Sequence, residues 1–221
     1  MTLALDVVRV EGPDAASYLH GQLSQDVEAL AVGADAWSYV LAPNGHIDAF
    51  VRLHRLADDA FALDVDAGFG EALESRLRRF LLRTKATITL QLGAGEGEAD
   101  DAARIVAGRP AMGRDIDERS VPAELGWLDQ AVSFTKGCYT GQELVARMDS
   151  RVAEPPRRLV RFAADAAMQT GDAITVDEVE VGAITSAAGG VALGYVKRGT
   201  ALDGAALVAG ASARIEGVAG A

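Results

Sequence analysis

The chain has 221 residues, of which 49% are hydrophobic, and a formal net charge of −11 at pH 7. This length and composition can bury a substantial core without disulfides, and the single cysteine excludes an intrachain disulfide or an all-cysteine metal site within one chain. The acidic excess disfavours generic nucleic-acid binding, because phosphate backbones are repelled at long range.

The first ten residues and the cysteine usage bear on the compartment. Asp6 and Arg9 interrupt the N-terminal stretch, which lacks the basic and apolar regions of a signal peptide. No stretch approaches the ~18 consecutive apolar residues of a membrane helix. One cysteine fits a reducing environment. We therefore expect a cytoplasmic protein that does not engage a membrane.

Hydrophobic periodicity predicts five strands and two helices in the first part of the chain. The predicted strands are Leu5–Val10, Trp37–Leu41, Ile47–Leu56, Phe61–Val65 and Lys85–Leu92. Apolar residues at helical spacing predict helices over 15–27 and 69–81. Asn44-Gly45 predicts a tight hairpin, because both residues tolerate positive φ. This order indicates an α+β fold with helices on a mostly antiparallel sheet.

The chain changes character at Glu154-Pro155-Pro156, where two prolines stiffen the connection. Before it, we expect a surface loop over 93–101, an irregular segment over 114–127 and a helix starting near Gly141; residues 104–106 suit a strand or a helix. After it, strand-like runs alternate with glycine turns. These runs are Arg158–Phe162, Ala173–Val176, Glu180–Ser186, Val191–Tyr195 and Ala213–Glu216. We predict two domains, residues 1–153 and 154–221, the second being a small β-barrel or sandwich.

The only cysteine, Cys138, lies in the stretch F-T-K-G-C-Y-T-G-Q-E-L-V-A-R, residues 134–147. Gly137 and Gly141 flank it and allow positive φ or a close approach of the backbone to a ligand. Lys136 is a nearby cation that would favour the thiolate, as would the start of the following helix. These features indicate a reactive, partly exposed thiol. The alternative is a small buried apolar residue, since free cysteine is often buried.

No usual partner of a catalytic thiol is close to Cys138 in sequence. His20, His46 and His54 all lie far upstream, so only folding could form a thiol–imidazole pair. None has metal-ligand spacing from Cys138, and neither a P-loop nor a dinucleotide fingerprint is present. We therefore expect no resident metal.

Two clusters of basic residues contrast with the acidic composition. They are Arg76, Arg78, Arg79, Arg83 and Lys85, and Arg151, Arg157, Arg158 and Arg161. Each cluster is either a local basic patch or an ordinary solvated segment. In the second interpretation, the first cluster is a solvated helix face and the second cluster is a basic linker.

Residues 136–143, K-G-C-Y-T-G-Q-E, resemble the K-G-C-[YF]-x-G-Q-E box of the YgfZ family, folate-binding proteins similar to the glycine-cleavage T-protein, an aminomethyltransferase. Nearly the whole chain shares the resemblance. Further matching stretches are Gly12–Ala15, Gly21–Val27, Pro43–Ile47, Pro122–Gly126 and Val145–Arg147. The resemblance implies a tetrahydrofolate-binding α+β region followed by a β-barrel. It also implies a role in iron–sulfur cluster assembly or repair, with reduced folate and iron–sulfur client or carrier proteins as partners, including enzymes that modify tRNA.

The resemblance assigns roles to single residues. Glu124 matches the carboxylate that holds the pterin ring, and Cys138 matches the family's functional thiol, a transient cluster ligand, redox switch or handle for a partner. Lys136 and Arg147 are candidates for binding the folate tail or for lowering the thiol pKa. The cofactor-binding set also includes Tyr139, Gln142 and Glu143, of which the last two could hydrogen-bond across the loop. For each, an ordinary structural role is the alternative.

Asp48 leaves an enzymatic alternative open. In the T-protein, a G-x-[IL]-D stretch places an aspartate near the reactive folate nitrogen, and Gly45–Asp48 matches it, although YgfZ-like chains often lack this carboxylate. Asp48 therefore motivates a tetrahydrofolate-dependent one-carbon, or aminomethyl, transferase as the second hypothesis. The plain alternative is an aspartate that keeps a hairpin soluble.

Overall fold

The computed structural model describes residues 2–145, 154–202 and 204–220. The chain forms two compact units. The sheet unit comprises Ala4–Gly97 and Leu128–Arg147, and the barrel unit comprises Met1–Leu3, Glu98–Trp127 and Met148–Ala221. These units differ from the predicted division at 153/154, because residues 98–127 pack with the barrel. Among the described residues, no helix has the length and apolar character that crossing a membrane requires.

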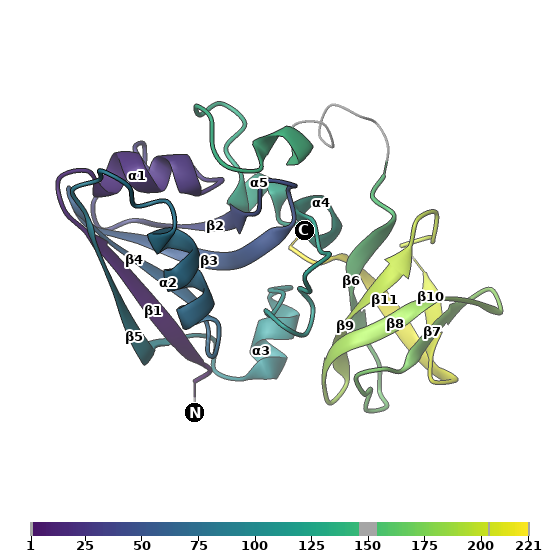
Figure 1. Ribbon diagram of the computed structural model, residues 1–221. Coiled ribbons are helices and arrows are strands. Elements are labelled where there is room, and N and C mark those ends of the chain that lie inside the picture. Colours follow the sequence, from purple (N-terminus) through teal and green to yellow (C-terminus); the bar gives the residue numbers. More distant parts are fainter. Residues whose placement is uncertain (1, 146–153, 203, 221) are drawn as a thin grey trace. The chain divides into compact units, whose positions relative to one another are not determined.

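The sheet unit is built on five antiparallel strands in the order β2-β3-β4-β1-β5 (Figure 1). Their bounds are β1 Ala4–Glu11, β2 Asp35–Leu41, β3 Ile47–Ala57, β4 Ala60–Asp66 and β5 Thr87–Glu96. All five predicted strands are confirmed. β5 continues into residues predicted as a surface loop, because Gly93 donates its N–H to the buried Asp6 carboxylate at 3.0 Å, beside a shift in the register of β5 against β1.

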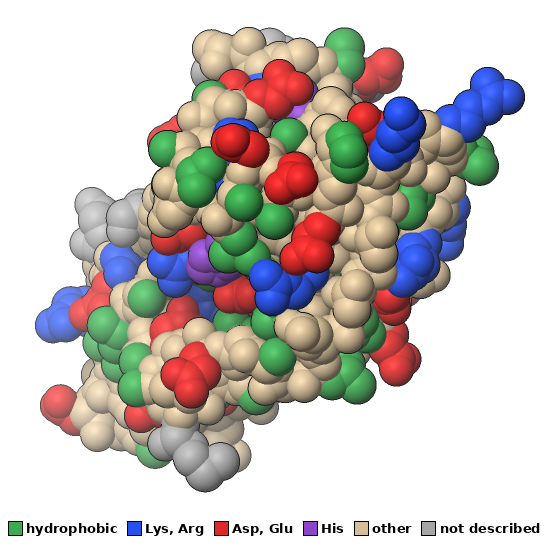
Figure 2. Space-filling view, turned by 90° about the vertical axis from the view of Figure 1, so that its left-hand side faces the viewer, with side chains coloured by type: hydrophobic (Ala, Val, Ile, Leu, Met, Phe, Trp, Pro, Cys, Tyr) green, Lys and Arg blue, Asp and Glu red, His purple; other side chains and the backbone are tan. Residues whose placement is uncertain are grey.

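Helices α1 (Ala15–Gln22) and α2 (Gly70–Arg78) pack on this sheet. The Tyr18 hydroxyl of α1 donates to the Leu77 carbonyl of α2 at 2.5 Å, which joins the two helices. The side of the unit that carries α1 and β5 shows acidic, basic and hydrophobic side chains intermixed (Figure 2).

Both helices end earlier than predicted. Leu23 takes an extended conformation and forms a bridge to Val40 of β2, although Leu23 and Val27 are both fully buried. After α2, Phe80 is 41% exposed. After α1 the apolar periodicity continues because Leu23 and Val27 stay buried, whereas after α2 the apolar side chains turn toward solvent.

The connection between β2 and β3 is a hairpin, but a longer one than Asn44-Gly45 predicted. Leu41 pairs with Ile47, so residues 42–46 form the loop. Only Gly45 has positive φ, 82°, and a Cβ there would lie 2.5 Å from the Leu144 side chain. The close approach of residue 144, far along the chain, makes glycine necessary at this position.

The barrel unit holds six strands that close in the order β10-β11-β6-β9-β8-β7. Their bounds are β6 Arg157–Ala163, β7 Ala173–Val176, β8 Val179–Ala188, β9 Val191–Lys197, β10 Ala205–Val208 and β11 Ala211–Val218. The barrel prediction is confirmed and the sandwich alternative is wrong. β10 is a strand that the sequence analysis missed, because A-A-L-V has only one β-branched residue. Phe162, Ile174 and Ile184 lie in the barrel core.

Three further helices, all short, have both ends among the described residues. Residues 104–106, which suited a strand or a helix, belong to the helix α3 (Asp101–Val106). Asp100 caps this helix by accepting the Ala103 N–H at 2.8 Å. The segment predicted as irregular contains one helical turn, α4 (Pro122–Leu125), in the barrel unit. In the sheet unit, α5 spans Leu128–Ala131, and residues 142–145 begin the predicted helix, whose remainder lies outside the described residues.

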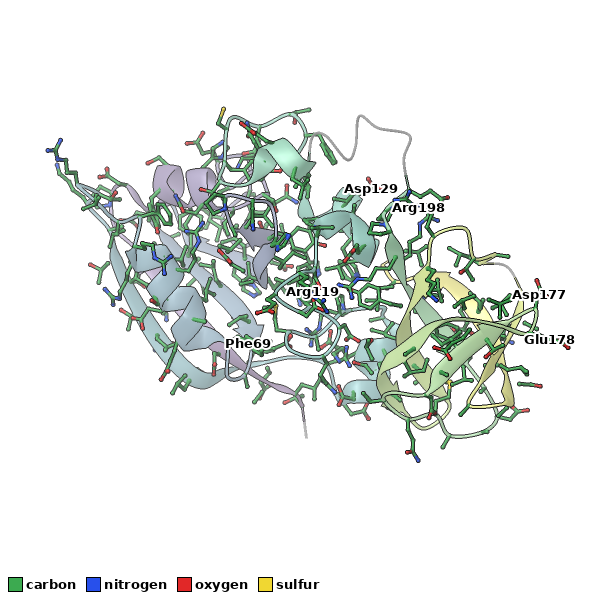
Figure 3. The ribbon with its side chains drawn as sticks, turned by 45° about the vertical axis from the view of Figure 1, so that its right-hand side comes forward. Phe69, Arg119, Asp129, Asp177, Glu178 and Arg198 are labelled. Carbon is green, nitrogen blue, oxygen red and sulfur yellow. The ribbon has the colours of Figure 1, made fainter. Side chains whose placement is uncertain are left out.

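The turn between β7 and β8 has an unusual backbone. Asp177 and Glu178 have positive φ values of 48° and 66°, and their side chains point away from the barrel (Figure 3). Non-glycine residues rarely adopt this conformation, which costs on the order of 1 kcal/mol or more.

Candidate functional site

The Cys138 loop, defined as residues 134–141, follows α5 in the sheet unit. Cys138 is a free, exposed cysteine. The exposed thiol expected from the flanking residues is therefore present, and the alternative of a buried apolar cysteine is wrong.

Lys136 ties the loop to the end of α1. Its Nζ donates to three backbone carbonyls, those of His20 at 2.5 Å, Leu23 at 2.8 Å and Gln25 at 3.0 Å. The ammonium also lies 5.0 Å from the centre of the Tyr139 ring. Burial lowers the pKa of Lys136 to about 8, although the Asp26 and Glu28 carboxylates favour its charged form. All three donors of the ammonium are therefore used by the protein itself.

The other side of Cys138 is fixed by a turn. The Tyr139 N–H donates to the Gln142 Oε1 at 3.0 Å, so the predicted hydrogen bond across the loop is confirmed for Gln142. Gly141 has φ 82°, and a Cβ there would lie 2.6 Å from the Ala42 carbonyl oxygen. Glu143 is exposed. Burial raises the pKa of Tyr139 to about 12, so its hydroxyl stays protonated.

One histidine does approach this loop. The His20 Nε2 would lie 4.0 Å from a Cβ placed on Gly137, next to the cysteine. The His20 Nδ1 lies 3.5 Å from the Asp26 carboxylate. Within the described ranges, no group of three or more His, Cys, Asp or Glu side chains is placed to hold a metal ion.

Asp48, the second residue of β3, pairs with a buried arginine. The Arg76 Nε of α2 donates to Asp48 at 2.8 Å; the Arg76 side chain is 8% exposed and that of Asp48 is 34% exposed. The same guanidinium donates to the Gln22 Oε1 at 3.2 Å and to the Leu41 carbonyl at 2.9 Å. In this structure Asp48 is thus the counter-ion of Arg76.

The Cys138 loop and Asp48 lie at the same end of the sheet unit. Gly141 packs on Leu41, the last residue of β2, and Arg76 donates to that residue's carbonyl. Lys136 contacts the residues that follow α1, while Arg76 contacts Gln22 at the end of α1. The Cys138 loop and the Asp48–Arg76 pair therefore contact the same two segments, the end of β2 and the end of α1 with the residues that follow it.

Glu124 belongs to the barrel unit and lies on α4, where it is 4% exposed. Arg157 of β6 donates from Nε to the Glu124 Oε2 at 3.0 Å and is itself held by Asp117 and Ser120, at 3.3 and 3.2 Å. The Tyr195 ring lies 4.0 Å from the guanidinium carbon. Burial raises the pKa of Glu124, while Arg157 opposes the shift. The alternative of a solvated loop glutamate is wrong.

Arg76 and Arg157 are the residues that the sequence analysis missed, since each was seen only as a member of a basic cluster. A signal existed for Arg76, because it shares the buried helical face of Leu73 and Leu77. No comparable signal marks Arg157. Arg147, predicted to contact folate or the thiol, lies outside the described residues.

Comparisons with known proteins agree with this architecture. The family described as the CAF17 C-terminal β-barrel domain matches residues 157–218. An uncharacterized protein of Haemophilus influenzae is 28% identical over 66% of this chain and 67% of its own length. A putative chloroplast transferase of Arabidopsis thaliana is 36% identical over 48% of this chain, which spans only 26% of that relative.

Among solved structures, the glycine cleavage system aminomethyltransferase T of Bartonella henselae superposes with a TM-score of 0.79 at 19% identity. The match covers 96% of this chain and 82% of that protein. It confirms the predicted α+β fold with a C-terminal barrel.

Proposed function

We propose that this chain, a YgfZ-like protein with the fold of the aminomethyltransferase T, binds a reduced folate and uses Cys138 in iron–sulfur cluster assembly or repair. The observation that carries the proposal is the exposure of the chain's only thiol on a loop anchored at both sides. The CAF17-type barrel and the aminomethyltransferase fold support a folate-related role. The clients would include iron–sulfur enzymes that modify tRNA.

The proposed task of Cys138 is to act as a transient ligand of a cluster in transit. After its proton leaves to solvent, the sulfur donates an electron pair to one iron of the cluster, which is the cargo. One sulfur supplies one ligand, so the remaining iron ligands stay with the carrier or client protein. Lys136 and Gly141 hold the loop on either side, which presents the sulfur without burying it. Such a ligand exchanges readily.

Glu124 fits the recognition of a pterin ring. Arg157 donates to its Oε2, and a backbone hydrogen bond from Val121 also favours the ionised form of this buried carboxylate. A 2-amino-pyrimidinone edge presents two N–H donors, and hydrogen bonds from them to a carboxylate contribute about 1.5–3 kcal/mol each. Arg157 would keep the carboxylate oriented and ionised. Tetrahydrofolate, when bound, supplies a carrier for one-carbon units.

A tetrahydrofolate-dependent aminomethyl transferase is the second candidate. Asp48 motivates it, and one relative is described as a putative transferase. The Asp48–Arg76 ion pair weakens this candidate, because one oxygen of the Asp48 carboxylate already accepts a hydrogen bond from the guanidinium. Incubation with tetrahydrofolate, formaldehyde and candidate amines tests it. Turnover no greater than that of Asp48→Asn would count against the transferase.

Complementation tests the role of the thiol. Cys138→Ala should fail to restore the activity of iron–sulfur enzymes in cells that lack the endogenous factor, whereas Ser133→Ala in the preceding segment should restore it. Cys138 is exposed, so its substitution leaves the core intact. Full restoration by Cys138→Ala would remove the thiol from the mechanism.

Calorimetry tests the folate site independently of the thiol. Glu124→Gln should weaken the binding of tetrahydrofolate by about 1–3 kcal/mol, because a charged acceptor is lost. Glu178→Gln, at the exposed tip of the β7–β8 turn, is the matched control and should bind like the unmodified chain. An unchanged affinity of Glu124→Gln would place the pterin elsewhere.

A further inference from the structure

The segment between α2 and β5 exposes large apolar side chains beside cations. This basic loop, residues 79–85, has the sequence R-F-L-L-R-T-K. Leu82 is 85% exposed and Phe80 is 41% exposed. Figure 2 shows hydrophobic side chains next to Lys and Arg side chains on the side of the molecule that carries α1 and β5. Neither the thiol nor the folate proposal uses this surface.

The cations of the basic loop are left without internal partners. In the same sequence cluster, Arg76 pairs with Asp48 and Arg78 pairs with Glu74. Arg79, Arg83 and Lys85 are exposed, and in the described part of the chain none of them forms an ion pair. In a chain with a net charge of −11, three unpaired cations on seven consecutive residues are a local reversal of charge.

The basic loop is held in a defined shape. The Lys85 N–H donates to the Asp14 carboxylate at 2.7 Å, and the Arg76 guanidinium carbon lies 4.3 Å from the centre of the Phe80 ring. Arg83 has φ 59°, a left-handed conformation that is unfavourable for an arginine because of its Cβ. A strained residue held by ordered neighbours is a reason to look for a function.

We infer that the basic loop is a docking surface for a short acidic segment of a partner protein, one that also carries apolar side chains. The cations meet carboxylates, and Leu82 and Phe80 meet the apolar side chains. A short segment fits better than a membrane or a nucleic acid. Those extended anionic surfaces would also meet the acidic remainder of the chain, whereas a short segment can be confined to the loop, and charges more than about one Debye length (~8 Å) away are largely screened.

Fluorescence anisotropy with a defined probe tests this surface on the full chain. The probe is a fluorescein-labelled dodecapeptide that alternates glutamate with leucine and phenylalanine. Arg79→Glu combined with Arg83→Asn and Lys85→Glu should weaken its binding at least tenfold, because three cations are lost and like charges replace two of them. Asparagine tolerates the left-handed conformation at position 83. Leu82→Ser should weaken binding several-fold.

Controls separate a specific surface from general charge effects. Lys197→Glu combined with Arg214→Glu, both exposed on the barrel, should leave binding within twofold. Versions of the peptide with glutamine for glutamate, or serine for the apolar residues, should bind more weakly. The inference is overturned if the loop variants bind the probe as the unmodified chain does. It is also overturned if phosphatidylserine vesicles or an oligouridylate bind the loop more tightly than the peptide.

Discussion

The pairing of Asp48 with Arg76 predicts a strong energetic coupling between these residues. Arg76→Met removes three hydrogen bonds, to Asp48, Gln22 and Leu41, from a side chain that is 8% exposed. Losing one partner of a buried ion pair costs about 3–5 kcal/mol. Asp48 is 34% exposed, so water replaces part of the loss, and we expect about 2–4 kcal/mol for Arg76→Met and about 1–2 kcal/mol for Asp48→Asn. The double variant should show a coupling energy of about 1–2 kcal/mol.

Urea unfolding of the two single variants, the double variant and the parent measures this coupling. Trp37 lies in β2 of the sheet unit and stacks on Phe50, so its fluorescence reports this unit. A common Trp127→Phe background removes the second tryptophan from all four proteins. The Glu74–Arg78 pair on α2, where Arg78 is 52% exposed, is the control and should couple by about 0.3–0.5 kcal/mol.

The opposite outcome has a definite meaning. If Asp48→Asn changes the free energy of unfolding by less than about 0.5 kcal/mol and the cycle shows no coupling, Asp48 is not the counter-ion of Arg76. Asp48 would then be available for proton transfer, and the transferase hypothesis would gain support at the expense of a structural role.

Three further predictions concern other parts of the chain. Lys136→Met should lower the free energy of unfolding by about 2–3 kcal/mol, because three carbonyls lose a charged donor, and should speed amide exchange at residues 137–140; Glu143→Gln should do neither. Glu178→Gly should stabilise the barrel unit by about 0.5–1 kcal/mol in thermal unfolding, by relieving the positive φ; a lower Tm would contradict this. Because burial raises the pKa of Glu124, tetrahydrofolate affinity measured by calorimetry should fall as the pH drops from 7 toward that raised pKa, whereas Glu124→Gln should show a flatter profile.

The strand pattern of this chain was largely predictable because alternation and glycine turns are local signals. All five strands of the sheet and five of the six barrel strands lie where the residues predicted them. The exception, β10, is short and has few β-branched residues, so its pairing with β11 and β7 decides its conformation. The helix ends were misplaced because Leu23 stays buried after its backbone has become extended.

The site was predictable in its residues and less so in their roles. The exposure of Cys138 agrees with the glycines around it, but the contacts of Lys136 link residues separated by more than a hundred positions, and no local pattern records them. For Arg76, the helical face gave a usable sign that a member of a basic cluster is buried. An arginine on the buried face of a helix requires a carboxylate nearby to neutralise its charge. Only the folded chain identifies that carboxylate as Asp48.

The two carboxylates that the family resemblance selected are each held by an arginine, yet their surroundings separate their proposed roles. Asp48 faces a guanidinium that is 8% exposed and has two further acceptors, so its negative charge completes a packed network inside the sheet unit. Glu124 is the more buried carboxylate, whereas its partner Arg157 is 28% exposed and is shared with Asp117 and Ser120. A buried carboxylate gains more than a half-exposed one from a ligand that brings two N–H donors, because less water competes for its oxygens. The energetic need for a ligand is thus greater at Glu124, which is why we assign pterin recognition to the barrel unit and a structural role to Asp48.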